Sequence, residues 1–273
     1  MDVIRRNNIM LSGPGGQPML FAHGYGCDQS MWRFVAPAFA DRYKVVLFDH
    51  VGAGRSDLSA YDRVRYASLG GYAADVIEIC EALDLRHVVM VAHSVSAMIA
   101  VLASIRAPDR FAALVLLGPS PRYIGAEGYD GGFKRADIEQ LLELQESNYL
   151  GWANTLAPLI IGDPEQRPEL VEELRNSFCR TDPEVARQFA AVTFLSDNRD
   201  DLIHVRAPTL IIQSEFDSIA STAVGRYVHE HIPGSEMVVL PVSGHCPHLS
   251  APQETIAAID AFLARHVRQI GPR

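Results

Sequence analysis

The sequence predicts an α/β fold, in which a mostly parallel central sheet is flanked by helices. Short apolar runs rich in Val, Ile and Leu recur along the chain, as in strands that are buried on both faces. Between these runs lie segments whose apolar residues have helical spacing. Strands that alternate with helices in this way are typical of a parallel sheet.

The first part of the chain keeps this alternation. Val3–Leu11 and Pro18–Ala22 are expected to form a hairpin, because a Gly- and Pro-rich cluster separates them. A helix is expected around Met31–Ala40, followed by a strand at Lys44–Asp49. Apolar spacing and β-branched runs then predict a helix, a strand, a helix and a strand at Tyr72–Leu83, Val88–His93, Ala97–Ile105 and Phe111–Leu117.

The alternation lapses between about Pro121 and Asp201. Amphipathic stretches with prolines at their starts or breaks predict helices at Asp137–Tyr149, Asn148–Ile161, Pro168–Cys179 and Pro183–Leu195. The strand pattern resumes at Thr209–Gln213 and Met237–Leu240, and Gln253–Val267 predicts a closing amphipathic helix. We therefore expect a helical insertion in a continuous sheet scaffold.

Composition narrows the class of protein. The 273 residues are 48% hydrophobic and 21% charged, as in an ordinary soluble globular protein. A net charge of −9 argues against nucleic acid or an anionic membrane as a partner. No apolar run approaches the ~18 residues of a membrane span, and the first residues lack the apolar core of a secretory signal. The four cysteines are widely spaced, which predicts free thiols in a reducing cytoplasm.

Ser94 stands where an apolar strand runs directly into a helix-forming segment. This is the layout of a nucleophile elbow, in which a serine occupies a tight, strained turn between strand and helix. The strain requires small neighbours, and the usual pattern is Gly-x-Ser-x-Gly. Here Ala92 and Ser96 take the glycine positions, and each carries a Cβ. By itself the pattern leaves a chance junction of strand and serine open.

The ends of later strands supply the partners that a nucleophilic serine needs. A serine hydroxyl requires a histidine base that is oriented by a carboxylate. Functional groups of parallel sheets gather beyond the carboxyl ends of the strands, and Asp217 and His245 follow two such strands. The order Ser94, Asp217, His245 is the triad order of α/β hydrolases. Glu215 is the alternative acid and His248 the alternative base in the same two loops.

An oxyanion hole needs two backbone N–H groups. One normally comes from the residue after the nucleophile, here Val95, and the other from the loop after an early strand. The loop His23-Gly24-Tyr25-Gly26 fits the second place, which makes Tyr25 the expected donor. His245-Cys246-Pro247-His248 has no third ligand in recognisable spacing, so we expect no metal and no cofactor.

Several segments together carry a family resemblance: residues 23–32 (HGYGCDQSMW), 48–57 (FDHVGAGRSD), 93–98 (HSVSAM) and 244–248 (GHCPH), with further matches in residues 118–197. With these segments the chain resembles the RsbQ-type α/β hydrolases. This family includes the bacterial stress regulator RsbQ and the plant karrikin and strigolactone receptors. Ser96 is shared with the karrikin-receptor-like members, so the departure from the glycine pattern is itself typical of the family.

The resemblance implies an α/β-hydrolase fold whose core is made of residues 1–121 and 196–273. Residues 122–195 would then be a four-helix lid over a mainly apolar pocket. The positions that match the family's pocket are Tyr25, Tyr123, Trp152, Leu156, Phe194 and Ile219. Plain core packing is the alternative for each of them, because aromatic residues on amphipathic helices are usually buried.

The expected function is cleavage of a small, mostly apolar ester or lactone by the triad. The resemblance also implies an alternative of a different kind, a small-molecule sensor that activates a partner phosphatase with a sensory domain in a stress-response pathway. A cofactor-free oxygenase or peroxidase on the same scaffold is a third hypothesis. A serine in the elbow argues against dehalogenases and epoxide hydrolases, which use aspartate there.

Overall fold

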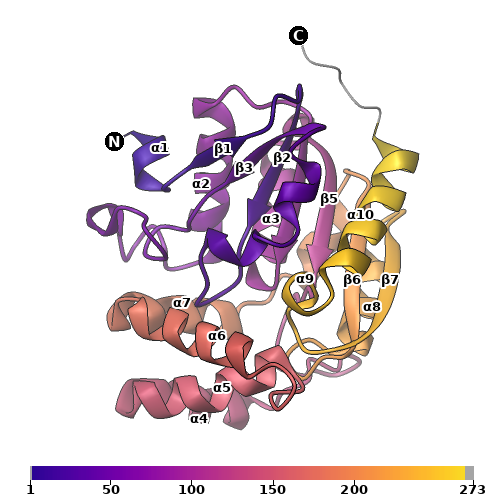
Figure 1. The fold of residues 1–273 in the computed structure, drawn as a ribbon. Helices are drawn as coiled ribbons and strands as arrows, with labels where there is room; N and C mark the ends of the chain where they lie inside the picture. The colour runs from indigo at the N-terminus through magenta and orange to yellow at the C-terminus, as the bar shows by residue number, and fades with distance from the viewer. Residues whose placement is uncertain (1, 268–273) are drawn as a thin grey trace.

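The computed structural model describes residues 2–267, and within them one seven-stranded sheet forms the centre of the molecule (Figure 1). The strand order is β1-β3-β2-β4-β5-β6-β7. Only β1 runs antiparallel to its neighbour, and the remaining pairs are parallel. The strands are β1 (Met10–Ser12), β2 (Gln17–Ala22), β3 (Tyr43–Leu47), β4 (Val88–His93), β5 (Phe111–Leu117), β6 (Thr209–Phe216) and β7 (Glu236–Ser243). The predicted α/β fold with a mostly parallel sheet is confirmed.

Helices pack alongside this sheet. α3 lies against β4 and β5, α2 lies against α3, and α8 and α10 lie against β6. Every residue of β2 and β4 is buried, which is the physical reason that both strands are apolar apart from Gln17 and His93. The helices are α1 (Val3–Arg6), α2 (Leu69–Ala82), α3 (Val95–Arg106), α8 (Thr222–His231), α9 (Pro247–Ser250) and α10 (Pro252–His266).

Four further helices separate β5 from β6 in the chain. They are α4 (Arg135–Ser147), α5 (Tyr149–Ile161), α6 (Pro168–Arg180) and α7 (Pro183–Leu195). Figure 1 shows them grouped at one end of the sheet, where the chain leaves the parallel strands. α5 packs between α4 and α6, and α4 also packs against α7. Each is amphipathic: on α6, for example, Leu170, Leu174 and Phe178 are buried at intervals of one helical turn.

Two of the predicted elements are wrong. Residues 3–6 form a helical turn, because the carboxylate of Asp2 accepts a hydrogen bond from the N–H of Ile4 (3.0 Å) and caps its start. β1 then pairs with β3, and no hairpin joins it to β2. The predicted helix around 31–40 is two short 3₁₀ turns, Gln29–Trp32 and Ala36–Phe39, since Pro37 lacks an N–H and disfavours an α-helical Ala36.

Other 3₁₀ turns lie at Leu58–Ala60, Pro108–Arg110 and Arg199–His204. The sequence analysis did not indicate α8 or the short α9. Across residues 2–267, none of the helices combines the length and the apolar character that crossing a bilayer requires.

Candidate active site

Ser94 occupies the turn between β4 and α3 with backbone angles φ +58° and ψ −125°. A positive φ is rare for a residue other than glycine, and it is typical of strained functional sites. The turn is held in place because the N–H of Ser94 donates to the carbonyl of Leu117 on β5 (2.8 Å). Ala92 and Ser96 are fully buried on either side, so both small residues fit where glycine is usual.

The structure brings Ser94, His245 and Asp217 together in one hydrogen-bonded chain. Ser94 Oγ lies 2.8 Å from His245 Nε2, and His245 Nδ1 lies 2.7 Å from Asp217 Oδ2. All three side chains are buried. A carboxylate on Nδ1 fixes the imidazole tautomer that leaves Nε2 free to accept the serine proton. The alternative residues, Glu215 and His248, take no part in these hydrogen bonds. Glu215 is exposed, and His248 packs elsewhere.

The surroundings of Asp217 keep its carboxyl group ionised. Its Oδ1 accepts hydrogen bonds from the backbone N–H groups of Ile219 (2.8 Å) and Ala220 (3.0 Å). Burial acts to raise the pKa of Asp217, but His245 and these N–H groups outweigh burial and hold the pKa below its ordinary value. The acid therefore carries its charge at neutral pH, as an orienting partner of His245 must.

The loop that carries His245 lies against the end of α5. The N–H of His245 donates to the carbonyl of Ile160 (2.6 Å), one of the last carbonyls of that helix, which have no partner within it. Gly244 has φ +97°, and a Cβ at this position would lie 1.9 Å from the carbonyl oxygen of Ile161. Glycine is therefore required for this close approach.

The loop after β2 lies beside the elbow. A Cβ on Gly24 would lie 2.6 Å from His93 Nδ1 and 3.3 Å from the Cβ of Ser94, so only glycine allows this contact. Within residues 2–267, the backbone N–H groups of Tyr25 and Val95 donate to no other protein group. These are the two N–H groups that the sequence predicts for an oxyanion hole, and both are free to bind a ligand's oxygen.

The side chain of Ser96 connects the elbow to the loop after β2 by a hydrogen bond. Its hydroxyl donates to the carbonyl of His23, so it must accept the proton of His50 Nε2 at 2.7 Å. His23 Nε2 in turn accepts from the N–H of His50 (3.1 Å). Burial lowers the pKa of His23 and of His50, which keeps both rings neutral. The serine that replaces glycine thus anchors the start of the loop.

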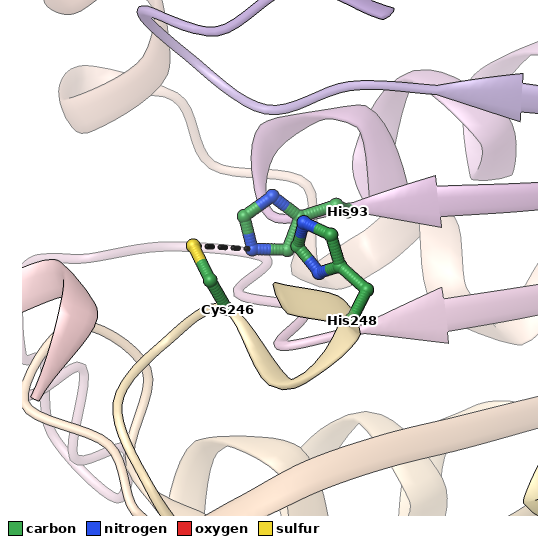
Figure 2. A group of neighbouring side chains, drawn as sticks. All are labelled: His93, Cys246 and His248. Atoms are coloured by element: carbon green, nitrogen blue, oxygen red, sulfur yellow. Dashed lines mark hydrogen bonds between the residues drawn. The ribbon is translucent and has the colours of Figure 1, made fainter. Parts of the chain in front are cut away.

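His93, Cys246 and His248 form a buried cluster (Figure 2), and the ring of His93 lies 4.9 Å from that of His245. Their potential ligand atoms lie within 4.8 Å of one another, so the structure supplies the third neighbour that sequence spacing lacked. We assign it no metal, because the nitrogen of His93 that faces Cys246 Sγ (3.9 Å) donates to the carbonyl of His245 (2.8 Å). Burial, with His245 nearby, lowers the pKa of His93 to about 3. His93 therefore acts as a neutral support for the His245 backbone.

A cavity of about 20 Å³ lies at the triad. A single water molecule needs at least about 10–15 Å³, so this cavity is small. Five of the six predicted pocket residues border it, and Trp152 lies behind the ring of Tyr25 instead. The hydroxyl of Tyr123 lies 3.5 Å from Ser94 Oγ. The sequence analysis did not place Cys27, Ile160, Leu174 and Thr193 in the lining.

This fold and this ordered Ser-His-Asp arrangement define the class of α/β hydrolases. A family model described as "Alpha/beta hydrolase family" matches residues 19–259, and the chain belongs to that family.

Its relatives include plant receptors and esterases. The chain is 40% identical to a karrikin insensitive 2 receptor of Petunia hybrida, covering 96% of this chain and 95% of the relative. It is 36% identical to the strigolactone esterase D14 of Arabidopsis thaliana, covering 100% and 98%. A solved hydrolase from Oleispira antarctica superposes with a TM-score of 0.94 at 45% identity, over 96% of both chains. The predicted resemblance to the karrikin and strigolactone receptor family is confirmed.

Proposed function

We propose that the chain is a serine hydrolase that cleaves a small, mostly apolar ester or lactone. The observation that carries the proposal is the 2.8 Å contact between Ser94 Oγ and His245 Nε2. The backbone N–H groups of Tyr25 and Val95, which have no partner among the described residues, accompany it. The cavity lining is mostly aliphatic and aromatic, which favours an apolar substrate. Whole-length relatives named as esterases support the same reaction class.

The mechanism follows from the positions of the groups. Ser94 Oγ attacks the ester carbonyl carbon while His245 Nε2 takes the hydroxyl proton, and Asp217 stabilises the imidazolium. The N–H groups of Tyr25 and Val95 bind the oxyanion of the tetrahedral intermediate. Collapse breaks the ester C–O bond, and His245 returns the proton to the leaving alcohol. Water, activated by His245, then hydrolyses the acyl-enzyme and restores Ser94.

The test is the hydrolysis of p-nitrophenyl acetate by Ser94→Ala. We expect turnover to fall by about 10⁴-fold or more, because no nucleophile remains. The matched control is Ser104→Ala, a buried serine of α3 that bonds only the carbonyl of Val101 and should keep full activity. Undiminished turnover by a folded Ser94→Ala variant would refute the mechanism. In the wild-type protein, intact mass spectrometry after exposure to a panel of lactones and esters would report which of them acylate Ser94.

α4–α7 act in this proposal as a lid formed by residues 122–195, inserted in a core of residues 1–121 and 196–273. The lid residues Leu156, Ile160, Leu174 and Phe194 border the cavity, and the loops after β4 and β7 supply the chemistry opposite them. Access of an ester to Ser94 then requires that the lid move, since the closed cavity is only about 20 Å³.

The second candidate function is a cytoplasmic sensor that holds its ligand with slow or single turnover. The small volume of the cavity and its lining by residues of α5, α6 and α7 favour it, because a lid that closes over a ligand retards release. Relatives that carry the name of karrikin receptors at 36–40% identity support it as well. Pull-down with a partner phosphatase that has a sensory domain discriminates between the two. Ligand-dependent capture with slow turnover supports sensing, whereas fast multiple turnover without capture supports a plain enzyme.

A further inference from the structure

Tyr25 is in contact with all four helices of the lid. Its backbone belongs to the loop after β2 and offers one of the two oxyanion N–H groups. Its side chain, by contrast, is buried among residues of α4, α5, α6 and α7. The same residue therefore belongs to the catalytic centre through its main chain and to the lid through its side chain.

Two hydrogen bonds fix the phenol of Tyr25 to the lid. Gln145 Nε2 of α4 donates to the phenol oxygen at 2.6 Å, and the phenol hydroxyl donates to the carbonyl of Ala186 on α7 at 3.0 Å. Gln145 is a buried glutamine on an otherwise apolar helix face. Burial raises the pKa of Tyr25 well above its ordinary value, so the phenol keeps the proton that this arrangement requires.

Aromatic contacts hold the ring of Tyr25 from the remaining directions. Its centroid lies 5.9 Å from that of Trp152 on α5 and 6.1 Å from that of Phe178 on α6. Phe189 and Phe194 of α7 approach edge-on at 5.6 and 6.2 Å. Aromatic pairs at these distances attract each other beyond the effect of their burial. The ring of Tyr25 is therefore in contact with α5, α6 and α7.

The backbone beside Tyr25 is fitted to the lid as well. Gly26 has φ +70°, and a Cβ there would lie 2.0 Å from the ring of Phe178. On the other side, Gly24 lies against His93 and the elbow. The loop is thus held between the elbow and the lid, with one glycine on each side. A shift of the lid must displace either Tyr25 or the ring packing around it.

We propose that Tyr25 couples the position of the lid to the oxyanion hole, and that Gln145 is the positioning residue of this coupling. The proposal rests on the hydrolase function proposed above. When the lid is closed, Gln145 and Ala186 hold the phenol and thereby aim the N–H of Tyr25 at the reacting carbonyl. When the lid moves to admit a substrate, these bonds separate, and the oxyanion hole is restored only when the lid closes over the bound ester.

The test compares Gln145→Met, Tyr25→Phe and the double variant in p-nitrophenyl acetate hydrolysis. Methionine keeps the length of glutamine but donates no hydrogen bond. The matched control is Glu146→Gln, which removes the negative charge from the 2.7 Å contact of Glu146 with Arg187, an interaction between the same two helices that does not involve Tyr25. The second readout is inhibition by 1,1,1-trifluoroacetone, whose hemiketal with Ser94 places an oxyanion in the hole.

We expect each single variant to lower kcat by about 3- to 10-fold, the effect of one misplaced hydrogen bond, while KM changes less. The inhibition constant of trifluoroacetone should rise by a similar factor. Because the two side chains act through one contact, the double variant should be no slower than the slower single variant. Glu146→Gln should match the wild type.

Two outcomes would overturn the coupling. In the first, Gln145→Met and Tyr25→Phe keep the wild-type kcat and inhibition constant and lose only thermal stability. In the second, Glu146→Gln slows the enzyme as much as they do, which would make general loosening of the lid the cause. If Gln145→Met does not fold, Tyr25→Phe alone carries the test. The Ser94→Ala result is separate, because its failure would refute the hydrolase function and leave the geometry of Tyr25 unchanged.

Discussion

Replacing Ser96 by glycine would restore the second glycine of the usual Gly-x-Ser-x-Gly pattern of the elbow, yet we expect it to destabilise the protein. The Ser96 hydroxyl donates to the carbonyl of His23 and accepts from His50 Nε2. His23, His50 and Ser96 are all fully buried. Since His50 Nδ1 has no partner among the described residues, the Ser96 contact is the single side-chain hydrogen bond of the His50 ring.

The magnitude follows from the two groups that lose their partner. An unpaired buried donor or acceptor costs about 1–3 kcal/mol, so Ser96→Ala should lower the free energy of unfolding by about 2–6 kcal/mol. Glycine adds up to about 1 kcal/mol of backbone entropy. Ser104→Ala on the same helix is the control, because Ser104 bonds only the carbonyl of Val101 and its loss should cost about 1 kcal/mol or less.

The assay is equilibrium unfolding in urea at neutral pH, with the m-value as the check that the variants unfold in the same way. The start of the oxyanion loop also loses its anchor, so p-nitrophenyl acetate turnover should fall in Ser96→Gly. If Ser96→Gly and Ser96→Ala both unfold within about 0.5 kcal/mol of Ser104→Ala, the hydroxyl network does not stabilise the elbow. The reasoning would then be refuted.

Four further predictions concern the site and its surroundings. Asp217→Asn should lower kcat by about 10⁴-fold, because an amide favours the wrong tautomer of His245. The lowered pKa of Asp217 means that its ionised form stabilises the fold above about pH 4, and that this stability is lost as the pH falls through the folded-state pKa. Gly26→Ala should cost more stability in urea than Gly128→Ala, since both have φ near +70° but only Gly26 faces Phe178. Iodoacetamide should modify the exposed Cys179 first and leave turnover unchanged, because burial raises the pKa of Cys27 and Cys246.

The predictions for Asp217→Asn, for Gly26→Ala and for the cysteines each have an outcome that contradicts them. An Asp217→Asn variant whose kcat stays within about tenfold of the wild type would remove Asp217 from the orienting role. Equal unfolding free energies for Gly26→Ala and Gly128→Ala would show that Phe178 moves aside at little cost. Peptide mapping that finds Cys27 or Cys246 alkylated before Cys179, with loss of activity, would mean that the cavity opens far more readily than its closed geometry implies.

Much of the fold could be predicted from the sequence because local pattern and burial agree. Every residue of β4 is buried, so an apolar run was a reliable sign of a strand there. α7 begins and ends where its proline and its apolar spacing predicted. The prediction failed at residues 3–11, where the pairing of β1 with β3 depends on which strands meet in space. Local pattern carries no information about that choice.

The sequence by itself predicted that Ser94, Asp217 and His245 would lie at one edge of the sheet. Ser94, Asp217 and His245 each follow a strand, and parallel strands bring their carboxyl ends to one edge of a sheet whatever the details of packing. Only the tertiary structure decided what holds these residues in place. Gln145 and Tyr25 are 120 positions apart and meet only because α4 closes over the loop after β2. His93 joins Cys246 and His248 across a comparable separation. Such contacts follow from how helices pack, which spacing along the chain does not specify.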